Sequence, residues 1–142
     1  MSVPVASIAS AGSFKNPKLT AIPDVQIDKS GKMKYILIKV HDPEKDREFK
    51  HIVRGICKAE YHADIFDEIS PNIESKGLDC ECVGGGRIQV DPSKKTLQIY
   101  GYSQGFGRAE HAITAKILER KYKEGISRFL LFNRRRIVYK IN

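Results

Sequence analysis

Several features that would place a protein in a common class are missing from this 142-residue sequence. No apolar run approaches the roughly 18 residues of a membrane-spanning helix, so we expect no passage through a bilayer. The first 20 residues contain no acidic residue, yet they lack the arginines of an organelle transit peptide and the apolar centre of a secretory signal. We therefore expect residues 1–20 to form a flexible extension rather than a targeting signal, and the protein to be cytoplasmic.

Cysteine is scarce, and the residues of several known metal and phosphate sites are absent. The three cysteines, Cys57, Cys80 and Cys82, include no CxxC pair. On a strand, Cys80 and Cys82 would point to the same face, which suits neither a zinc knuckle nor an ordinary disulfide. The sequence also lacks a P-loop, a Cys-x5-Arg nucleophile loop and the clustered Asp and His ligands of a metallophosphatase. We expect reduced thiols, no metal site and no cofactor.

The positive charge is concentrated at the C-terminal end. The net charge is +8, and the segment from Glu119 to Asn142 contains eight Lys or Arg residues and only two Glu residues. The run from Arg134 to Arg136 is its densest part, and such a run attracts nucleic acid or acidic surfaces. Because no recognition motif accompanies the run, we interpret residues 133–142 as a solvated basic tail and do not expect nucleic acid as a partner.

Hydrophobic periodicity predicts one α+β domain over residues 21–132. Strands are expected at 33–40, 49–57, 79–83, 87–91, 96–102 and 126–132. Helices are expected at 60–69 and 109–122, where apolar residues recur at helical spacing. The order of these elements indicates one mixed sheet of about six strands with two main helices packed on it. We expect the domain to be a monomer.

Two features suit chemistry on a phosphate group. His62 falls in the first turn of the helix expected at 60–69, on its apolar face, where a histidine can also be an ordinary core residue. The helix dipole disfavours imidazolium, which lowers the pKa and leaves a neutral ring able to act as a base or nucleophile. The glycine-rich segment from Gly101 to Gly107 joins a strand to a helix, and it is either a plain turn or a backbone cradle for phosphate oxygens.

Two cations lie on strands beside apolar residues. Arg54 shares a strand face with Ile52 and Ile56. A guanidinium in such a place needs a partner, either a carboxylate such as Glu60 or a bound anion. Lys34 opens the first expected strand, where it is either a snorkelling surface lysine or a ligand-binding residue. The residues themselves therefore predict a candidate anion site beside a histidine, without a specific reaction.

Five blocks of sequence, taken in order, resemble the Janus/Ocnus family, whose best characterised members are small phosphohistidine phosphatases of animals. The blocks are KYILIKV at 34–40, IVRG at 52–55, AEYHADI at 59–65, DCECVGGGRI at 79–88 and YGYS at 100–103. The resemblance runs from about residue 22 to residue 122. The segments before Ala21 and after Phe132 do not resemble vertebrate members of the family.

The resemblance implies roles for individual side chains. His62 corresponds to the catalytic histidine of the family. Lys34 corresponds to a lysine that helps to hold the substrate phosphate, and Arg54 corresponds to an arginine that supports the site. His111 also matches a family position, and we assign it no catalytic role.

The resemblance further implies a backbone cradle for phosphate. The N–H groups of Ser103, Gln104 and Gly105 correspond to the amides that bind the phosphate oxygens. Vertebrate members commonly have alanine at the position of Gly105. Because the backbone does the binding, we expect this difference to be tolerated, although glycine leaves the loop less preorganised.

The implied activity is metal-independent hydrolysis of the P–N bond of phosphohistidine in proteins or peptides. His62 would act either as the general base or as the group that takes the phosphoryl group itself. One alternative is a non-catalytic regulatory or binding member of the family, with the sex-specific or reproductive role associated with the insect janus and ocnus genes. A second is a nucleic-acid binder that uses Arg134, Arg135 and Arg136. The sequence does not identify the phosphoprotein substrate.

Overall fold

A mixed sheet organises the structure. The computed structural model describes residues 16–122 and 126–141. The strands are β1 (Val25–Gln26), β2 (Gly31–Asp42), β3 (Lys45–Ile56), β4 (Asp79–Asp91), β5 (Thr96–Tyr100), β6 (Ile126–Phe132) and β7 (Arg136–Ile141). They form a seven-stranded sheet in the order β1-β3-β2-β4-β5-β7-β6. β1 pairs in parallel with β3, and the other neighbouring strands pair antiparallel.

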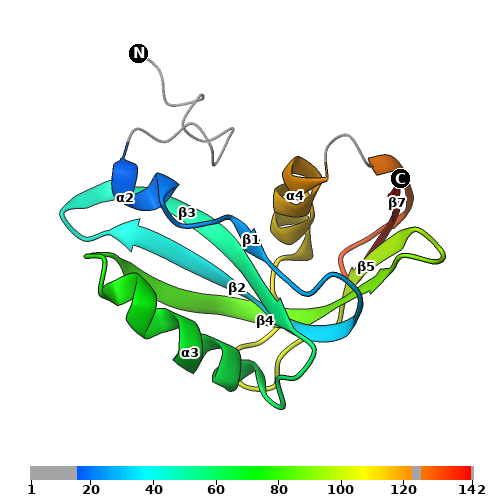
Figure 1. Cartoon of the computed structure of the whole chain (residues 1–142), viewed down its shortest axis with the longest axis horizontal. Helices are drawn as coiled ribbons and strands as arrows, with labels where there is room; N and C mark the ends of the chain where they lie inside the picture. Colours follow the sequence, from blue (N-terminus) through cyan, green and yellow to red (C-terminus); the bar gives the residue numbers. More distant parts are fainter. Residues whose placement is uncertain (1–15, 123–125, 142) are drawn as a thin grey trace.

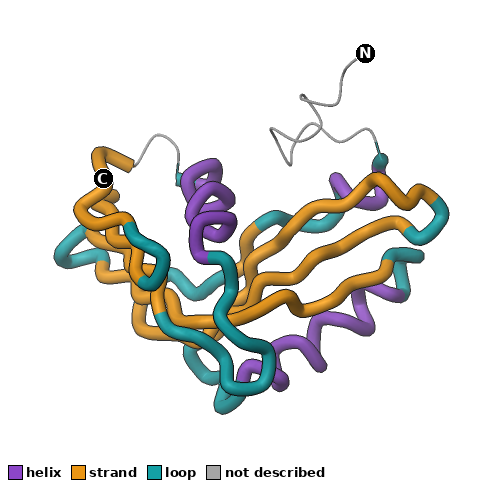
Figure 2. The backbone as a smooth tube through the Cα atoms, turned by 180° about the vertical axis from the view of Figure 1, so that it is seen from behind, coloured by secondary structure: helices purple, strands orange, loops and turns teal. Residues whose placement is uncertain are grey.

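Helices cover both faces of this sheet. α3 (His62–Glu74) lies on one face and α4 (His111–Lys121) lies on the opposite face (Figure 1). The view from behind shows the same two layers (Figure 2), and the short α2 (Pro17–Thr20) precedes β1. No helix in the described part of the chain is long and apolar enough to cross a membrane. The predicted α+β class, with a mixed sheet and two main helices, is confirmed.

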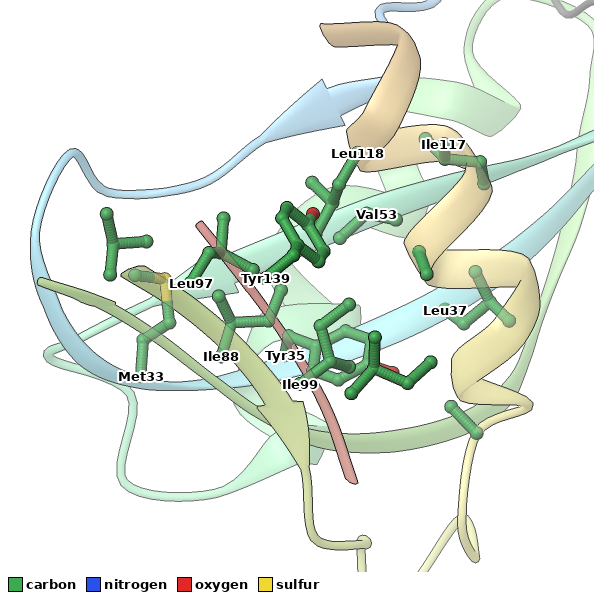
Figure 3. Packing of buried hydrophobic residues seen from close by; sticks show 14 residues of the cluster. Met33, Tyr35, Leu37, Val53, Ile88, Leu97, Ile99, Ile117, Leu118 and Tyr139 are labelled. Atoms are coloured by element: carbon green, nitrogen blue, oxygen red, sulfur yellow. The ribbon is translucent and has the colours of Figure 1, made fainter. Parts of the chain in front are cut away.

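The sheet divides the core into two apolar clusters. Because side chains alternate along a strand, Tyr35 and Leu37 of β2 join the cluster under α4, whereas Ile36 and Ile38 join the cluster under α3. Figure 3 shows the α4 cluster, in which Tyr139 of β7 packs among side chains from the central strands. The C-terminal strand is therefore part of the core.

Strand β7 lies in the segment that the sequence predicts to be a basic tail. It pairs with β5 from Arg136 to Lys140, and its alternate residues Ile137 and Tyr139 are buried. The expectation of a tail is therefore wrong for residues 136–141. The physical reason is that a short apolar run, residues 137–139, directly follows the arginines, so the charge of the arginine run masks a strand whose alternate residues are buried.

The folded domain also begins before residue 21. Leu19 of α2 is fully buried in the cluster under α3. Asn16 caps α2 by accepting the N–H of Lys18 at 2.9 Å, and its side-chain amide donates to the carboxylate of Asp42, also at 2.9 Å. The expectation of a flexible extension is therefore wrong for residues 16–20. Residues 1–15 lie outside the described part of the chain.

β4 is one continuous strand where the sequence predicts two short ones. Its three glycines, Gly84–Gly86, all pair with β2. A Cβ atom on Gly85 would lie 2.8 Å from Cδ2 of His62, and one on Gly86 would lie 2.7 Å from Cε1 of His111. Successive residues of a strand face opposite ways. The glycines therefore let the first residues of α3 and α4 contact opposite faces of the same strand.

Candidate active site

A cleft of about 860 Å³ lies at the N-terminal end of α3. Its walls come from the start of α3, from the neighbouring strands β2 and β4, and from the segment that follows β5. The residues that line it are Lys34, Glu60–Ala63, Arg87 and Tyr100–Phe106. The structure thus brings together His62, Lys34 and the predicted phosphate-binding segment, which are far apart in the sequence.

His62 is held firmly at the start of α3. The helix start is closed by two hydrogen bonds of 3.1 Å: the N–H of Tyr61 donates to the carboxylate of Asp64, and the N–H of Asp64 donates to the carbonyl of Tyr61. Only 8% of His62 is exposed. The ring is therefore fixed by its helix on one side and by the glycines of β4 on the other.

The hydrogen bonding of His62 decides which ring nitrogen is available. Its Nε2 atom lies 2.9 Å from the carbonyl oxygen of Gly86. Because a carbonyl oxygen only accepts, Nε2 carries the hydrogen, and Nδ1 of the neutral ring is left as an acceptor. This arrangement gives the cleft a basic nitrogen with a defined tautomer.

The surroundings of His62 keep the ring neutral. Burial is the main reason that the pKa of His62 lies below its usual value of 6.5, and the positive charges of Lys34 and Arg87 lower it further. The hydrogen bond to Gly86 acts in the opposite direction and is outweighed. The predicted lowering is confirmed in direction, but its main cause is burial, whereas the sequence argument relied on the helix dipole.

The segment after β5 is a tight turn. The N–H of Ser103 donates to the carbonyl of Gly107 at 3.1 Å, and the N–H of Gly107 donates back to the carbonyl of Ser103 at 2.8 Å. The Oγ atom of Ser103 accepts the N–H of Phe106 at 3.1 Å. The Ser103 amide, predicted to bind phosphate, is thus engaged within the turn. The amides of Gln104 and Gly105 have no acceptor in the described part of the chain, so they are free for an anion.

The turn is placed next to His62 by packing. The ring of Phe106 packs edge-on against Phe66 of α3, with 6.0 Å between the ring centroids. A Cβ atom on Gly85 would lie within 3.0 Å of both Ser103 and His62. The turn and the histidine therefore converge over a single glycine of β4.

A buried network of hydrogen bonds holds Gly101, the first residue of the glycine-rich segment from Gly101 to Gly107. The hydroxyl of Tyr35 lies 2.7 Å from Nδ1 of His111 and 3.0 Å from the hydroxyl of Thr114. Nε2 of His111 lies 2.9 Å from the carbonyl oxygen of Gly101, so Nε2 donates to Gly101 and Nδ1 accepts from Tyr35. His111 is fully buried. It therefore positions the turn through Gly101 and does not itself reach the cleft.

We expect Tyr35→Phe to destabilise the protein by about 1–3 kcal/mol, because it leaves Nδ1 of His111 and the Thr114 hydroxyl without their buried partner. Urea unfolding measures the loss. Tyr102→Phe is the matched control, since Tyr102 is largely exposed. Equal unfolding midpoints for Tyr35→Phe and the unmodified protein would contradict the role given to the network.

Arg54 lies apart from the cleft. Its guanidinium donates to the carbonyl of Val53 at 2.9 Å and to the carbonyl of Pro23 at 2.8 Å. Burial lowers its pKa to about 10, and the charge of Asp24 opposes this shift, so the group stays charged at neutral pH. The structure does not pair Arg54 with Glu60 or bring it to His62. Its contacts instead tie the segment before β1 to β3.

Arg87 is the cleft residue that sequence reasoning missed. In the pairing of β2 with β4 it lies directly opposite Lys34. The two cations are therefore neighbours, and both lower the pKa of His62. The arginine is visible in the sequence after the three glycines, but its place beside Lys34 depends on the strand register.

The remaining candidate metal ligands do not form a cluster. All three cysteines are free, and burial raises the pKa of both Cys80 and Cys82 to about 11. Within residues 16–122 and 126–141, no group of three or more His, Cys, Asp or Glu residues is placed to hold a metal ion.

Comparison with known proteins places the chain among its relatives. The Janus/Ocnus family model matches residues 19–125. The chain belongs to the Janus/Ocnus family. The 14 kDa phosphohistidine phosphatase of Sus scrofa is 47% identical over 110 residues, which cover 75% of this chain and 87% of the relative. The protein of the same name from Homo sapiens is 46% identical, with 75% and 88% covered.

Other relatives in the Janus/Ocnus family carry a different name. The sex-regulated protein janus-A of Drosophila pseudoobscura pseudoobscura is 46% identical over 108 residues, which cover 74% of this chain and 72% of the relative. The family match contains every residue that lines the cleft and ends just before β6. The hairpin of β6 and β7 therefore follows the matched residues.

Proposed function

We propose that this Janus/Ocnus family member is a phosphohistidine phosphatase that hydrolyses the P–N bond of phosphohistidine in proteins or peptides. The observation that carries the proposal is a neutral His62 with Nε2 bonded to Gly86 and Nδ1 left as an acceptor, in a cleft that also presents cations and free amides. Two relatives named phosphohistidine phosphatase, which match three-quarters of the chain, support it.

The phosphoryl group would bind between the turn and the strands. The free N–H groups of Gln104 and Gly105 would donate to its oxygens, and Lys34 and Arg87 would supply positive charge. Hydrogen bonds that strengthen as negative charge develops on the oxygens lower the barrier of the reaction. The family role of Lys34 fits this geometry, and Ser103 contributes by shaping the turn.

In the chemical step, Nδ1 of His62 would accept a proton from water as the water oxygen forms a bond to phosphorus. The P–N bond breaks, and its electron pair remains on the departing imidazole, which takes up a proton. The products are inorganic phosphate and histidine. Direct attack of Nδ1 on phosphorus would use the same nitrogen. Rapid quenching at alkaline pH, where phosphohistidine survives, separates the two routes by the presence or absence of phosphorylated His62.

We expect kcat/KM to be flat at and above neutral pH and to fall on the acid side. His62 is active as the neutral ring, and its pKa lies below 6.5 because of burial and the charges of Lys34 and Arg87. Lys34→Gln removes one of these charges and should raise the pKa of His62. The fall of kcat/KM on the acid side should therefore begin at a higher pH. Lys32→Gln, outside the cleft lining, is the control. An acid limb that does not move in Lys34→Gln would contradict the assignment.

We also propose that hydrolysis needs no metal ion. The cations and amides of the cleft stabilise charge on the phosphoryl oxygens, which is a task that a metal ion performs in other phosphatases. Phosphate release should therefore be unchanged by a chelator. Loss of activity in the chelator that magnesium or another divalent ion restores would overturn this part of the proposal.

A non-catalytic regulatory or binding role is the alternative that the janus-A relatives keep open. It predicts that the cleft binds phosphohistidine without releasing phosphate. Incubation of the purified chain with a phosphohistidine peptide, followed by measurement of inorganic phosphate, distinguishes the two functions. Release well above the spontaneous rate supports the phosphatase, and binding without release supports the alternative.

A further inference from the structure

The turn between β6 and β7 presents a run of arginines that the catalytic cleft does not use. The Oδ1 atom of Asn133 accepts the N–H of Arg135 at 2.9 Å and the N–H of Arg136 at 3.0 Å. The N–H of Asn133 donates to the carbonyl of Arg136 at 3.1 Å. These bonds close the turn with Arg134 and Arg135 exposed at its tip.

This turn lies beside the cleft. Arg136 is paired with Tyr100 in the register of β5 and β7. Its guanidinium stacks over the Tyr100 ring at 4.3 Å from the centroid and donates to the side-chain oxygen of Gln98 at 2.6 Å. Tyr100 itself lines the cleft and directly precedes Gly101, where the phosphate-binding segment begins. The arginine turn and that segment therefore start from the same end of β5.

The charges that line the cleft and its edge are mostly positive. Lys34 and Arg87 line the cleft, and Arg136 stands at its edge. Within the residues that the structure describes, no carboxylate forms an ion pair with Arg134 or Arg135. Glu60, two residues before α3, is the only acidic residue among the described residues that line the cleft. A bound chain would therefore meet positive charge on the side of the turn.

We propose that Arg134 and Arg135 bind acidic residues of the polypeptide that carries the phosphohistidine, so that the enzyme prefers phosphohistidine within acidic sequence. This inference rests on the proposed function. An acidic polypeptide fits the turn better than nucleic acid does, because the turn starts beside the cleft that would hold the phosphohistidine of that same polypeptide. The turn follows the residues that the family model matches.

The test compares two phosphohistidine peptides of equal length, one with glutamates flanking the phosphohistidine and one with glutamines in their place. We expect the full chain to have a KM about threefold to tenfold lower for the acidic peptide, as two exposed ion pairs allow, with similar kcat values. The double variant Arg134→Gln/Arg135→Gln should lose this preference while it hydrolyses the neutral peptide normally. The charge-matched control, Lys32→Gln/Lys94→Gln, changes exposed lysines outside the cleft lining and should keep it. High ionic strength should weaken the preference.

A direct binding measurement tests the docking role of the arginines separately from the proposed phosphatase activity. Fluorescence anisotropy with both labelled peptides gives a Kd that does not depend on turnover. If neither peptide is hydrolysed but the acidic one binds more tightly through the arginines, the phosphatase proposal fails and the docking role stands. If both are hydrolysed with equal KM, or if the double variant keeps the preference, the docking role is wrong. Arginine-dependent binding of a duplex oligonucleotide, without any preference for the acidic peptide, would assign the turn to nucleic acid and also overturn the proposal.

Discussion

His62→Ala is expected to lower the rate of phosphate release from a phosphohistidine peptide by about 10²–10⁴-fold, the contribution typical of a general base. The variant loses Nδ1, the acceptor that the Gly86 hydrogen bond leaves available. Alanine suits a helix start, and the loss of one buried hydrogen bond costs only about 1–3 kcal/mol. The variant should therefore remain folded, which circular dichroism and urea unfolding will show.

A histidine outside the cleft provides the matched control for this experiment. His41 lies on β2, and its Nε2 atom lies 3.6 Å from the carboxylate of Asp79. His41→Ala should keep the full rate of phosphate release. If folded His62→Ala retained most of the activity, the catalytic role of His62 would be refuted.

Gly85→Ala is expected to have the second large effect. The added Cβ would lie 2.8 Å from Cδ2 of His62 and 2.9 Å from the carbonyl oxygen of Tyr35. The backbone of β2 cannot move easily, so the ring of His62 must shift. Displacement of a catalytic group by about 1 Å can cost roughly 10²-fold in rate. We expect a loss of that size in kcat, with a destabilisation of about 1–3 kcal/mol from overpacking.

Gly105→Ala tests whether this effect is specific to the contact with His62. A Cβ on Gly105 would meet no atom within 4 Å, and the N–H that binds phosphate in our proposal is retained. Its rate should stay close to that of the unmodified protein, because the added methyl group meets open space. A Gly85→Ala enzyme as active as Gly105→Ala would show that the close approach over β4 does not position His62.

The sequence was sufficient for the fold class because the central strands and the two main helices each show their own periodicity. The strand from Lys34 to Val40 and the helix that begins at His62 are both visible as local patterns. Local patterns also placed His62 and the Gly101–Gly107 segment correctly at the start of a helix and after a strand. Their meeting in one cleft became an expectation only through the resemblance to a family.

Most of the features that sequence reasoning missed depend on contacts between distant segments. The sequence predicts two separate strands on either side of Gly84–Gly86, because nothing local shows that two helix starts contact one continuous β4 there. Arg87 joined the site through its register with Lys34. Arg54 was expected at the site, but its hydrogen bonds go to backbone carbonyls elsewhere. Strand β7 was missed because the charge of the arginine run outweighed the short apolar run at residues 137–139 that follows it.

The most direct test of the account is the rate at which the purified full chain releases inorganic phosphate from a histidine-phosphorylated peptide in the presence of a chelator, with folded His62→Ala in parallel. We predict release far above the spontaneous rate for the unmodified chain and a loss of about 10²–10⁴-fold in the variant. Release by the unmodified chain that is no faster than spontaneous hydrolysis would contradict the proposed function. Equal rates for the two proteins would contradict the role of His62.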